Sequence, residues 1–137
     1  MKSERIKDKI DEIEAYLGEL SSFSPESIEE YISNPEKKAA CERYFERIVE
    51  AAVDIAFLII KEKNMKIPEE DKQAFDILGE NCIIELGLAN RLKDAKGMRN
   101  ILAHEYGKID DGIVFHSVTE ELQKDMEEFV KSVKENA

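Results

Sequence analysis

The stretch Ala51-Ala52-Val53-Asp54-Ile55-Ala56-Phe57-Leu58-Ile59-Ile60 decides how this chain folds, because Asp54 is its only polar residue. It belongs to a longer segment, ending at about Lys63, that starts with the helix-initiating signal Asn34-Pro35-Glu36. A helix that is apolar nearly all round must be covered on several sides. The sequence therefore predicts a long central helix with the other helices packed around it.

The remaining sequence supplies the helices that would cover the central one. Ile113-Val114-Phe115 is expected to be a short extended piece, and no alternating run is long enough for a sheet. At 137 residues the chain fits one domain, 1–137. The predicted fold is all-α, an antiparallel bundle of four to six helices. Helical apolar spacing or helix-start signals mark residues 3–20, about 24–33, about 69–78, 83–104 and 117–135.

Small residues mark the predicted helix ends and contacts. Ser24, which precedes a proline, is expected to begin the second helix, and Gly79 is expected to end the fourth. Gly97 inside the fifth helix suggests a close helix approach or a bend. Cys41 and Cys82 match no metal or redox spacing, so both are expected to be reduced thiols in the core.

The formal net charge of −11 argues against a protein that coats nucleic acid through bulk electrostatics. Residues 91–108 differ from the rest, because five basic and only two acidic side chains lie there. This window could contact a few phosphates or could simply be a basic helix end. The N-terminus is charged from Lys2 onward and the longest apolar run is too short to span a bilayer. We expect a cytoplasmic protein without membrane contact.

Two carboxylates of the central helix are candidates for a supporting role. Asp54 interrupts the apolar run, so it is expected to be buried or to line a cleft, where it needs a partner. Arg47, Glu50 and Asp54 share one stripe of the helix and could pair along it. A structural ion-pair ladder is the favoured interpretation. A role for Glu50 and Asp54 in a functional site stays open beside it.

The main functional candidate is Gly97-Met98-Arg99-Asn100-Ile101-Leu102-Ala103-His104-Glu105-Tyr106-Gly107-Lys108, which holds one of only two histidines. On a helix with about 100° per residue, Asn100 and His104 are neighbours, and Arg99 shares the other face with Tyr106. Histidine transfers protons near neutral pH, and a guanidinium binds phosphate oxygens through paired hydrogen bonds. RNA carries its own 2′-hydroxyl nucleophile, so this chemistry requires neither a metal nor a cofactor.

Arg99 and His104 diverge on a straight helix and cannot readily bind the same atom. Either the helix ends near His104, or a second copy of the motif across a two-fold dimer completes the site. A purely structural alternative is that His104 caps the C-terminus of its helix by interacting with the last carbonyls. We assign His116 to a structural role outright.

Arg99-Asn100-Ile101-Leu102-Ala103-His104-Glu105-Tyr106 resembles the R-x4-H-x-Y signature of the HEPN superfamily, in its HepT (DUF86) branch. The resemblance extends over essentially the whole chain, through Arg43-Tyr44, Glu50 to Ala56, Pro68 to Leu78 and Ile109-Asp110. It implies a HEPN-like helical bundle that forms a homodimer or higher oligomer and acts as a metal-independent endoribonuclease toxin.

The resemblance also implies a role for each residue of the motif. Arg99 and His104 match the catalytic pair, and Asn100 matches the polar residue often found beside the arginine. Tyr106 matches the tyrosine that a cognate minimal nucleotidyltransferase antitoxin modifies with AMP, which silences the toxin.

Three functions follow from these observations. The favoured one is an RNA-cleaving toxin of a HepT/MntA-type (type VII) toxin–antitoxin module, silenced by AMPylation. The second is a non-catalytic HEPN module that binds a nucleotidyltransferase partner or a nucleotide. The third is a plain helical dimer in which the motif only shapes the interface.

Overall fold

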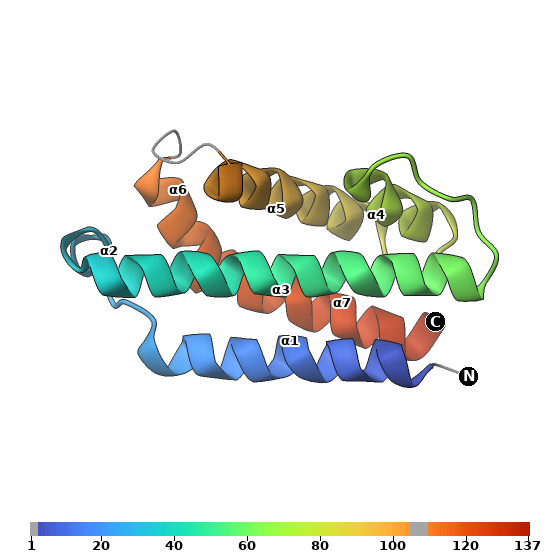
Figure 1. Ribbon diagram of the computed structural model, residues 1–137, viewed down its shortest axis with the longest axis horizontal. Coiled ribbons are helices and arrows are strands. Elements are labelled where there is room, and N and C mark those ends of the chain that lie inside the picture. The colour runs from blue at the N-terminus through green and yellow to red at the C-terminus, as the bar shows by residue number, and fades with distance from the viewer. Residues whose placement is uncertain (1–2, 105–109) are drawn as a thin grey trace.

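The computed structural model describes residues 3–104 and 110–137, and within these ranges every regular element is a helix. Figure 1 shows α1, α3 and α5 side by side, with α7 behind them and neighbouring long helices antiparallel. The predicted all-α bundle is therefore confirmed. The helices are α1 (Glu4–Phe23), α2 (Ile28–Ser33), α3 (Pro35–Glu62), α4 (Asp71–Glu80), α5 (Leu86–His104), α6 (Asp111–His116) and α7 (Leu122–Asn136), with a π-helical turn, η1 (Ser117–Glu121), before α7.

Helix α3 is the centre of the bundle, as its sequence predicts. It contacts α1, α2, α4, α5 and η1, and the apolar residues at 51–53, 55–56 and 59–60 are all buried. Complete burial of an isoleucine such as Ile55 contributes about 1.5–3 kcal/mol. Asn34 caps this helix by accepting a hydrogen bond from the backbone N–H of Lys37 at 3.1 Å. Asp54 is the exposed exception within the apolar run.

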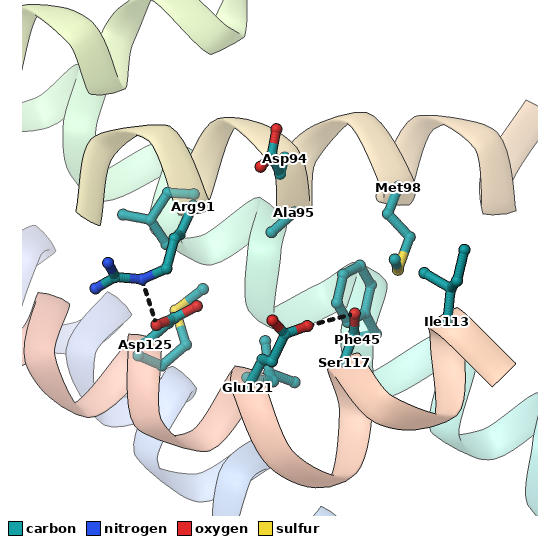
Figure 2. Close-up of a pocket in the computed structure, with 12 residues that line it drawn as sticks. Phe45, Arg91, Asp94, Ala95, Met98, Ile113, Ser117, Glu121 and Asp125 are labelled. Carbon is teal, nitrogen blue, oxygen red and sulfur yellow. Dashed lines mark hydrogen bonds and ion pairs between the residues drawn. The ribbon is translucent and has the colours of Figure 1, made fainter. Parts of the chain in front are cut away.

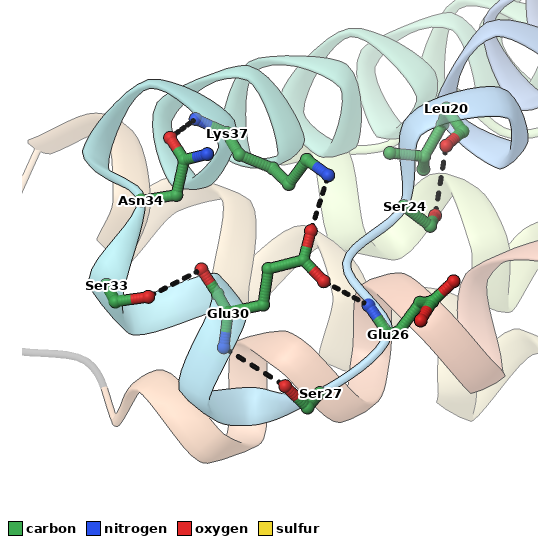
Figure 3. A network of polar contacts seen from close by, with 8 residues as sticks. All are labelled: Leu20, Ser24, Glu26, Ser27, Glu30, Ser33, Asn34 and Lys37. Carbon is green, nitrogen blue, oxygen red and sulfur yellow. Dashed lines mark hydrogen bonds and ion pairs between the residues drawn. The ribbon is translucent and has the colours of Figure 1, made fainter.

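The corner between α1 and α3 differs from the prediction at Ser24. This residue donates a hydrogen bond to the Leu20 carbonyl at the end of α1, at 2.9 Å, and does not cap α2. The cap of α2 is Ser27, which accepts from the Glu30 backbone N–H at 3.1 Å (Figure 3). Glu30 also pairs with Lys37 at 2.6 Å, which ties α2 to α3. A cap requires a side-chain oxygen aimed at the backbone N–H three residues ahead, and Ser27 provides it.

The sequence predicts that α4 ends at Gly79, but the helix continues to Glu80. Gly79 instead lies at the contact between α4 and α5. A Cβ atom there would lie 2.9 Å from Leu86 Cδ2 and 3.4 Å from Ala89 Cβ, so the missing side chain allows α5 to approach. The chain turns at Cys82, whose φ is 60°, and α5 therefore starts at Leu86, later than predicted. Cys82 is exposed and not in the core, whereas Cys41 is buried as expected.

The predicted extended piece at 113–115 is wrong, because this segment lies in α6. Asp110 caps α6 by accepting from the backbone N–H of Ile113 at 3.1 Å. Val114, Val118, Leu122 and Met126 are all buried, at a spacing of four residues. This spacing runs through α6, η1 and α7 and gives one continuous apolar stripe, which outweighs the strand preference of three consecutive β-branched or aromatic residues. In the described ranges, no helix has the length and apolar character needed to cross a membrane.

Candidate functional site

The motif residues lie at the C-terminal end of α5. Arg99 is half-buried, and one of its terminal nitrogens, Nη1, lies 3.5 Å from Asn100 Oδ1, a long contact. His104 is the last described residue of α5 and is exposed. The predicted end of the helix near His104 lies at the edge of the described residues and stays a prediction. Tyr106, the predicted modification site, lies outside the described residues.

A network of charged side chains holds Arg99 against the central helix. Arg99 Nε lies 2.9 Å from Glu50 Oε1, and the same carboxylate oxygen lies 2.6 Å from Lys96 Nζ. Lys96 Nζ also lies 3.2 Å from Asp71 Oδ2, so the network joins α3, α4 and α5. The structure thus brings Glu50 and Arg99 together, as the prediction of a supporting role for Glu50 requires.

Lys96 is the member of this network that sequence reasoning missed. Only 5% of its side chain is exposed, and a buried ammonium group is tolerated only when it is paired. Glu50 and Asp71 provide that pairing. The signal was present in the sequence, because Lys96 continues the four-residue spacing of the buried Leu88 and Leu92.

Lys96 also determines how strongly Glu50 neutralises Arg99. Because Glu50 Oε1 faces two cations, its single negative charge is divided between them. Among the described residues, Arg99 Nε is buried without a hydrogen-bond partner, so its contact with Glu50 is an ion pair and not an aligned hydrogen bond. The buried Nε faces Glu50, so a ligand such as phosphate would have to bind the terminal nitrogens of Arg99, whose side chain is 23% exposed.

Arg99 lines a groove of about 290 Å³ between α1 and α3, together with Glu50 and Asp54. Asp54 is exposed and lies 3.2 Å from Lys9 Nζ of α1, so it lines a cleft but is not buried. This hydrogen bond to Asp54 is the main cause that raises the pKa of Lys9. Arg47 Nη1 donates to the Tyr16 hydroxyl at 3.3 Å.

The predicted ladder along α3 is therefore wrong. Arg47, Glu50 and Asp54 each pair with another helix: Arg47 and Asp54 with α1, and Glu50 with α5. Side chains three or four residues apart on a helix gain little from pairing with one another. Partners on neighbouring helices compete with that local arrangement, and a sequence alone does not reveal them.

A second cavity, of about 220 Å³, lies between α5 and the α6–η1–α7 segment (Figure 2). Its walls include apolar residues such as Phe45 and Met98, and neither Arg99 nor His104 lines it. Its arginine, Arg91, is paired with Asp125 at 2.9 Å and with Glu128 at 2.6 Å. This cavity therefore offers no arginine for phosphate binding comparable to Arg99, whereas His104 lines neither this cavity nor the groove.

The second histidine fits the structural role assigned to it. His116 lies at the end of α6 and pairs with Glu120, one helical turn further along the chain. Neither residue lines the groove that contains Arg99.

Comparison with known proteins identifies relatives of the whole chain. The family described as "Ribonuclease HepT-like" matches residues 6–133. The chain is 32% identical to the tRNA nuclease HepT of Aphanizomenon flos-aquae over 119 residues, which cover 87% of this chain and 81% of that protein. It is 35% identical to the mRNA nuclease HepT of Shewanella oneidensis over 89 residues, which cover 65% of this chain and 66% of that protein.

Solved structures show the same fold. The tri-AMPylated HEPN toxin of Shewanella oneidensis, in complex with the MNT antitoxin, aligns with a TM-score of 0.90 and 27% identity, over 98% of this chain and 99% of that one. A toxin–antitoxin crystal structure with AMP-PNP aligns with a TM-score of 0.89 and 25% identity, over 97% of this chain and 99% of that one. By sequence and by fold, the chain belongs to the HepT-like ribonuclease family.

Proposed function

We propose that this protein cleaves RNA at a site built on Arg99 and His104, as the toxin of a HepT-type toxin–antitoxin pair. As a member of the HepT-like family it is a ribonuclease, and its partner is a nucleotidyltransferase antitoxin. The observation that carries the choice of site is Arg99, which is held by Glu50, is partly exposed and lines the groove, on the same part of α5 as the exposed His104. Cellular RNA is the substrate, so we place the protein in the cytoplasm.

The proposed reaction uses the ribose 2′-hydroxyl as the nucleophile. A histidine accepts the 2′-hydroxyl proton as the 2′-oxygen attacks the adjacent phosphorus. The bond from phosphorus to the 5′-oxygen then breaks, and that oxygen takes a proton from an acid. The products are a 2′,3′-cyclic phosphate and a free 5′-hydroxyl end. Arg99 stabilises the negative charge that develops on the phosphate oxygens, and Asn100 supports its side chain.

A homodimer would bring the second histidine that this reaction needs. Arg99 and His104 lie five residues apart on α5 and project from different sides of it. A two-fold axis near this helix end would place the His104 of each copy opposite the other, one as the base and one as the acid. Asp54 then remains a structural support, through its ion pair with Lys9.

Mixing wild-type chains with chains carrying His104→Ala tests the shared site. Because the site needs the His104 of both copies, mixed dimers should be inactive, and subunit exchange should lower the activity below the share of wild-type chains. An obligate monomeric variant with full activity would contradict the shared site.

Tyr106 is the proposed point of regulation. Its phenolic oxygen would attack the α-phosphate of ATP bound to the antitoxin, forming a phosphodiester with AMP and releasing pyrophosphate. Tyr106 follows His104 by two residues, so the added nucleotide would block access to the motif. Co-expression with the adjacent reading frame, followed by intact-mass measurement, should show AMP additions. Their persistence in full in Tyr106→Phe would contradict this assignment.

The catalytic proposal is tested by incubating the protein with tRNA and with mRNA in the presence of a metal chelator. We expect cleavage with cyclic phosphate ends, and a loss of about 10²–10⁴-fold in His104→Ala, the usual contribution of a general acid–base group. His116→Ala is the matched control, because His116 is also an exposed histidine but lies on α6, outside the motif. Absence of cleavage by the wild-type protein, with binding of the antitoxin retained, would instead favour the non-catalytic module.

A further inference from the structure

The groove beside Arg99 holds two further arginines that form no ion pair. Arg43 and Arg47 are exposed on α3 and line the groove, and neither makes an ion pair within residues 3–104 and 110–137. In contrast, Arg91 and Arg99 are both paired with carboxylates. In a chain with 31 acidic and 20 basic side chains, an unpaired arginine pair in one groove calls for an anionic ligand.

The spacing of the two arginines suits an extended ligand. They are four residues apart on α3, which places them one turn, or about 6 Å, apart along the helix axis. A guanidinium presents hydrogen-bond donors in a planar fork that matches phosphate oxygens. Two such groups in line along a helix can bind two phosphates of one strand, and Arg99 lines the same groove.

Three of the four carboxylates that line the groove form an ion pair with a lysine. Lys9 pairs with Asp54 at 3.2 Å and with Glu12 at 3.4 Å, while the buried Lys96 pairs with Glu50. Glu46 also lines the groove and has no such partner among the described residues. The lining as a whole carries four basic and four acidic side chains, and Arg43 and Arg47 are the cations of this lining that no ion pair among the described residues uses.

Tyr16 fixes the position of one of the arginines. Its hydroxyl accepts from Arg47 Nη1 at 3.3 Å, and its ring packs edge-on against Tyr44, with centroids 5.8 Å apart. Holding a guanidinium in place reduces the side-chain entropy that is lost when a ligand binds. The Tyr16 ring also lines the groove, where it offers an aromatic surface to a base of a single strand.

We propose that Arg43 and Arg47 form a backbone-binding subsite for the RNA strand that flanks the phosphate held by Arg99. The inference rests on the proposed function. It adds the path that the RNA strand follows along the groove. The subsite binds phosphates irrespective of base sequence, so it contributes affinity and register and no base specificity. It also provides local attraction for RNA on a protein whose total charge repels it.

The experiment measures binding of a 2′-O-methyl RNA oligonucleotide by fluorescence anisotropy over a series of KCl concentrations. Methylation removes the nucleophile, so binding is measured without cleavage. Arg43→Ala/Arg47→Ala should weaken binding at least tenfold at low salt. It should also reduce the slope of log K against log salt by about 1.4, because each single-strand phosphate contact contributes about 0.7. Arg43→Lys/Arg47→Lys keeps the charges and should retain most of the slope.

Arg91→Ala/Lys93→Ala is the matched control. It removes the same charge from α5, where both side chains are paired with carboxylates, and should change affinity less than twofold. Unchanged affinity and slope in Arg43→Ala/Arg47→Ala would overturn the subsite. The subsite is equally overturned if this variant binds RNA normally but loses the antitoxin or dissociates into monomers, since the surface would then serve a protein interface.

Failure of the subsite and failure of the proposed ribonuclease function give different results. If the wild-type protein binds the methylated strand through these arginines but does not cleave unmodified RNA, the subsite stands and the catalytic proposal fails. If it cleaves RNA and the two arginines make no difference to binding, the catalytic proposal stands and the subsite fails.

Discussion

Helix α5 contributes one arginine to each of two cavities, and the two arginines are in different states. Arg91 is neutralised by Asp125 and Glu128 beside an apolar cavity. Arg99 shares one carboxylate with Lys96 and lines a groove with unpaired arginines. The number of arginines does not distinguish the two cavities. What distinguishes them is how much of the positive charge is already used in contacts within the fold.

The same difference decides between the two interpretations of the basic window at residues 91–108, phosphate binding and a basic helix end. Two of its cations, Arg91 and Lys93, belong to ion pairs with α7 and α4, and Lys96 is buried. These three are structural, so the interpretation as a basic helix end holds for them. Only Arg99, among the described cations of the window, lines the candidate groove.

Replacing Lys96 should produce the largest change in stability. Lys96→Met removes the cation that Glu50 and Asp71 share. Because these carboxylates are 36% and 48% exposed and Glu50 keeps its contact with Arg99, the loss should be about 1.5–3 kcal/mol, the value of a hydrogen bond to a charged group. Lys93→Met removes an exposed pair with Asp76 and should cost at most about 1 kcal/mol. Urea unfolding measures both variants. Equal losses would show that burial of Lys96 does not distinguish the two lysines.

A companion variant tests whether Glu50 is the group that Lys96 neutralises. Lys96→Met/Glu50→Gln removes a positive and a negative charge together, so it should recover part of the stability lost in Lys96→Met. If the two substitutions are strictly additive in the free energy of unfolding, the coupling between them does not exist.

Arg91→Ala should have a small effect on both stability and activity. The Arg91 side chain is exposed, and exposed ion pairs contribute about 0–1 kcal/mol. Thermal unfolding and an RNA-cleavage assay with the same preparation measure the two quantities. A large loss of cleavage with unchanged stability would move the functional site toward the α5–α7 cavity.

The smallest effect on the free energy of unfolding is expected for Glu42. This residue is a charged group in a third kind of environment. It is buried beside the Tyr31 hydroxyl, which donates to its Oε2 at 3.2 Å, and burial is the main cause that raises its pKa. The folded state thus binds this proton more tightly than the unfolded state, so ionisation of Glu42 destabilises the fold. Glu42→Gln should gain stability relative to wild type as pH rises from below 4.5 through the raised pKa.

The measurement is urea unfolding of Glu42→Gln and wild type over a series of pH values that rises from about pH 4 to about pH 8. A stability difference that does not change with pH would contradict the role of burial. Glu36→Gln is a suitable control, because Glu36 is exposed in the first turn of α3.

The sequence predicts the fold well where burial has a clear period. Helix α3 follows from an apolar run interrupted only by Asp54, and α1 follows from its single stripe of isoleucines and leucines. It fails where a local preference competes with long-range packing. Gly79 is needed for contact with Leu86, and Val114 continues a stripe that is completed only in α7.

The site was predictable in part. The motif singled out Arg99 and His104, and the charge on α3 singled out Glu50. The groove itself depends on contacts between residues far apart in the chain, such as Lys9 with Asp54, which no local pattern contains. Lys96 could have been found from its place on the buried stripe of α5, because a lysine there needs a carboxylate.

The most direct test compares Arg99→Ala with Arg91→Ala in cleavage of one labelled RNA under single-turnover conditions. Both substitutions remove an ion-paired arginine from α5, so they change the net charge equally. We predict that Arg99→Ala slows cleavage by about 10²–10³-fold, the usual effect of removing one group that stabilises the transition state, while Arg91→Ala stays near wild type. Equal rates for the two folded variants would contradict the assignment of the active site to Arg99 and the groove that it lines.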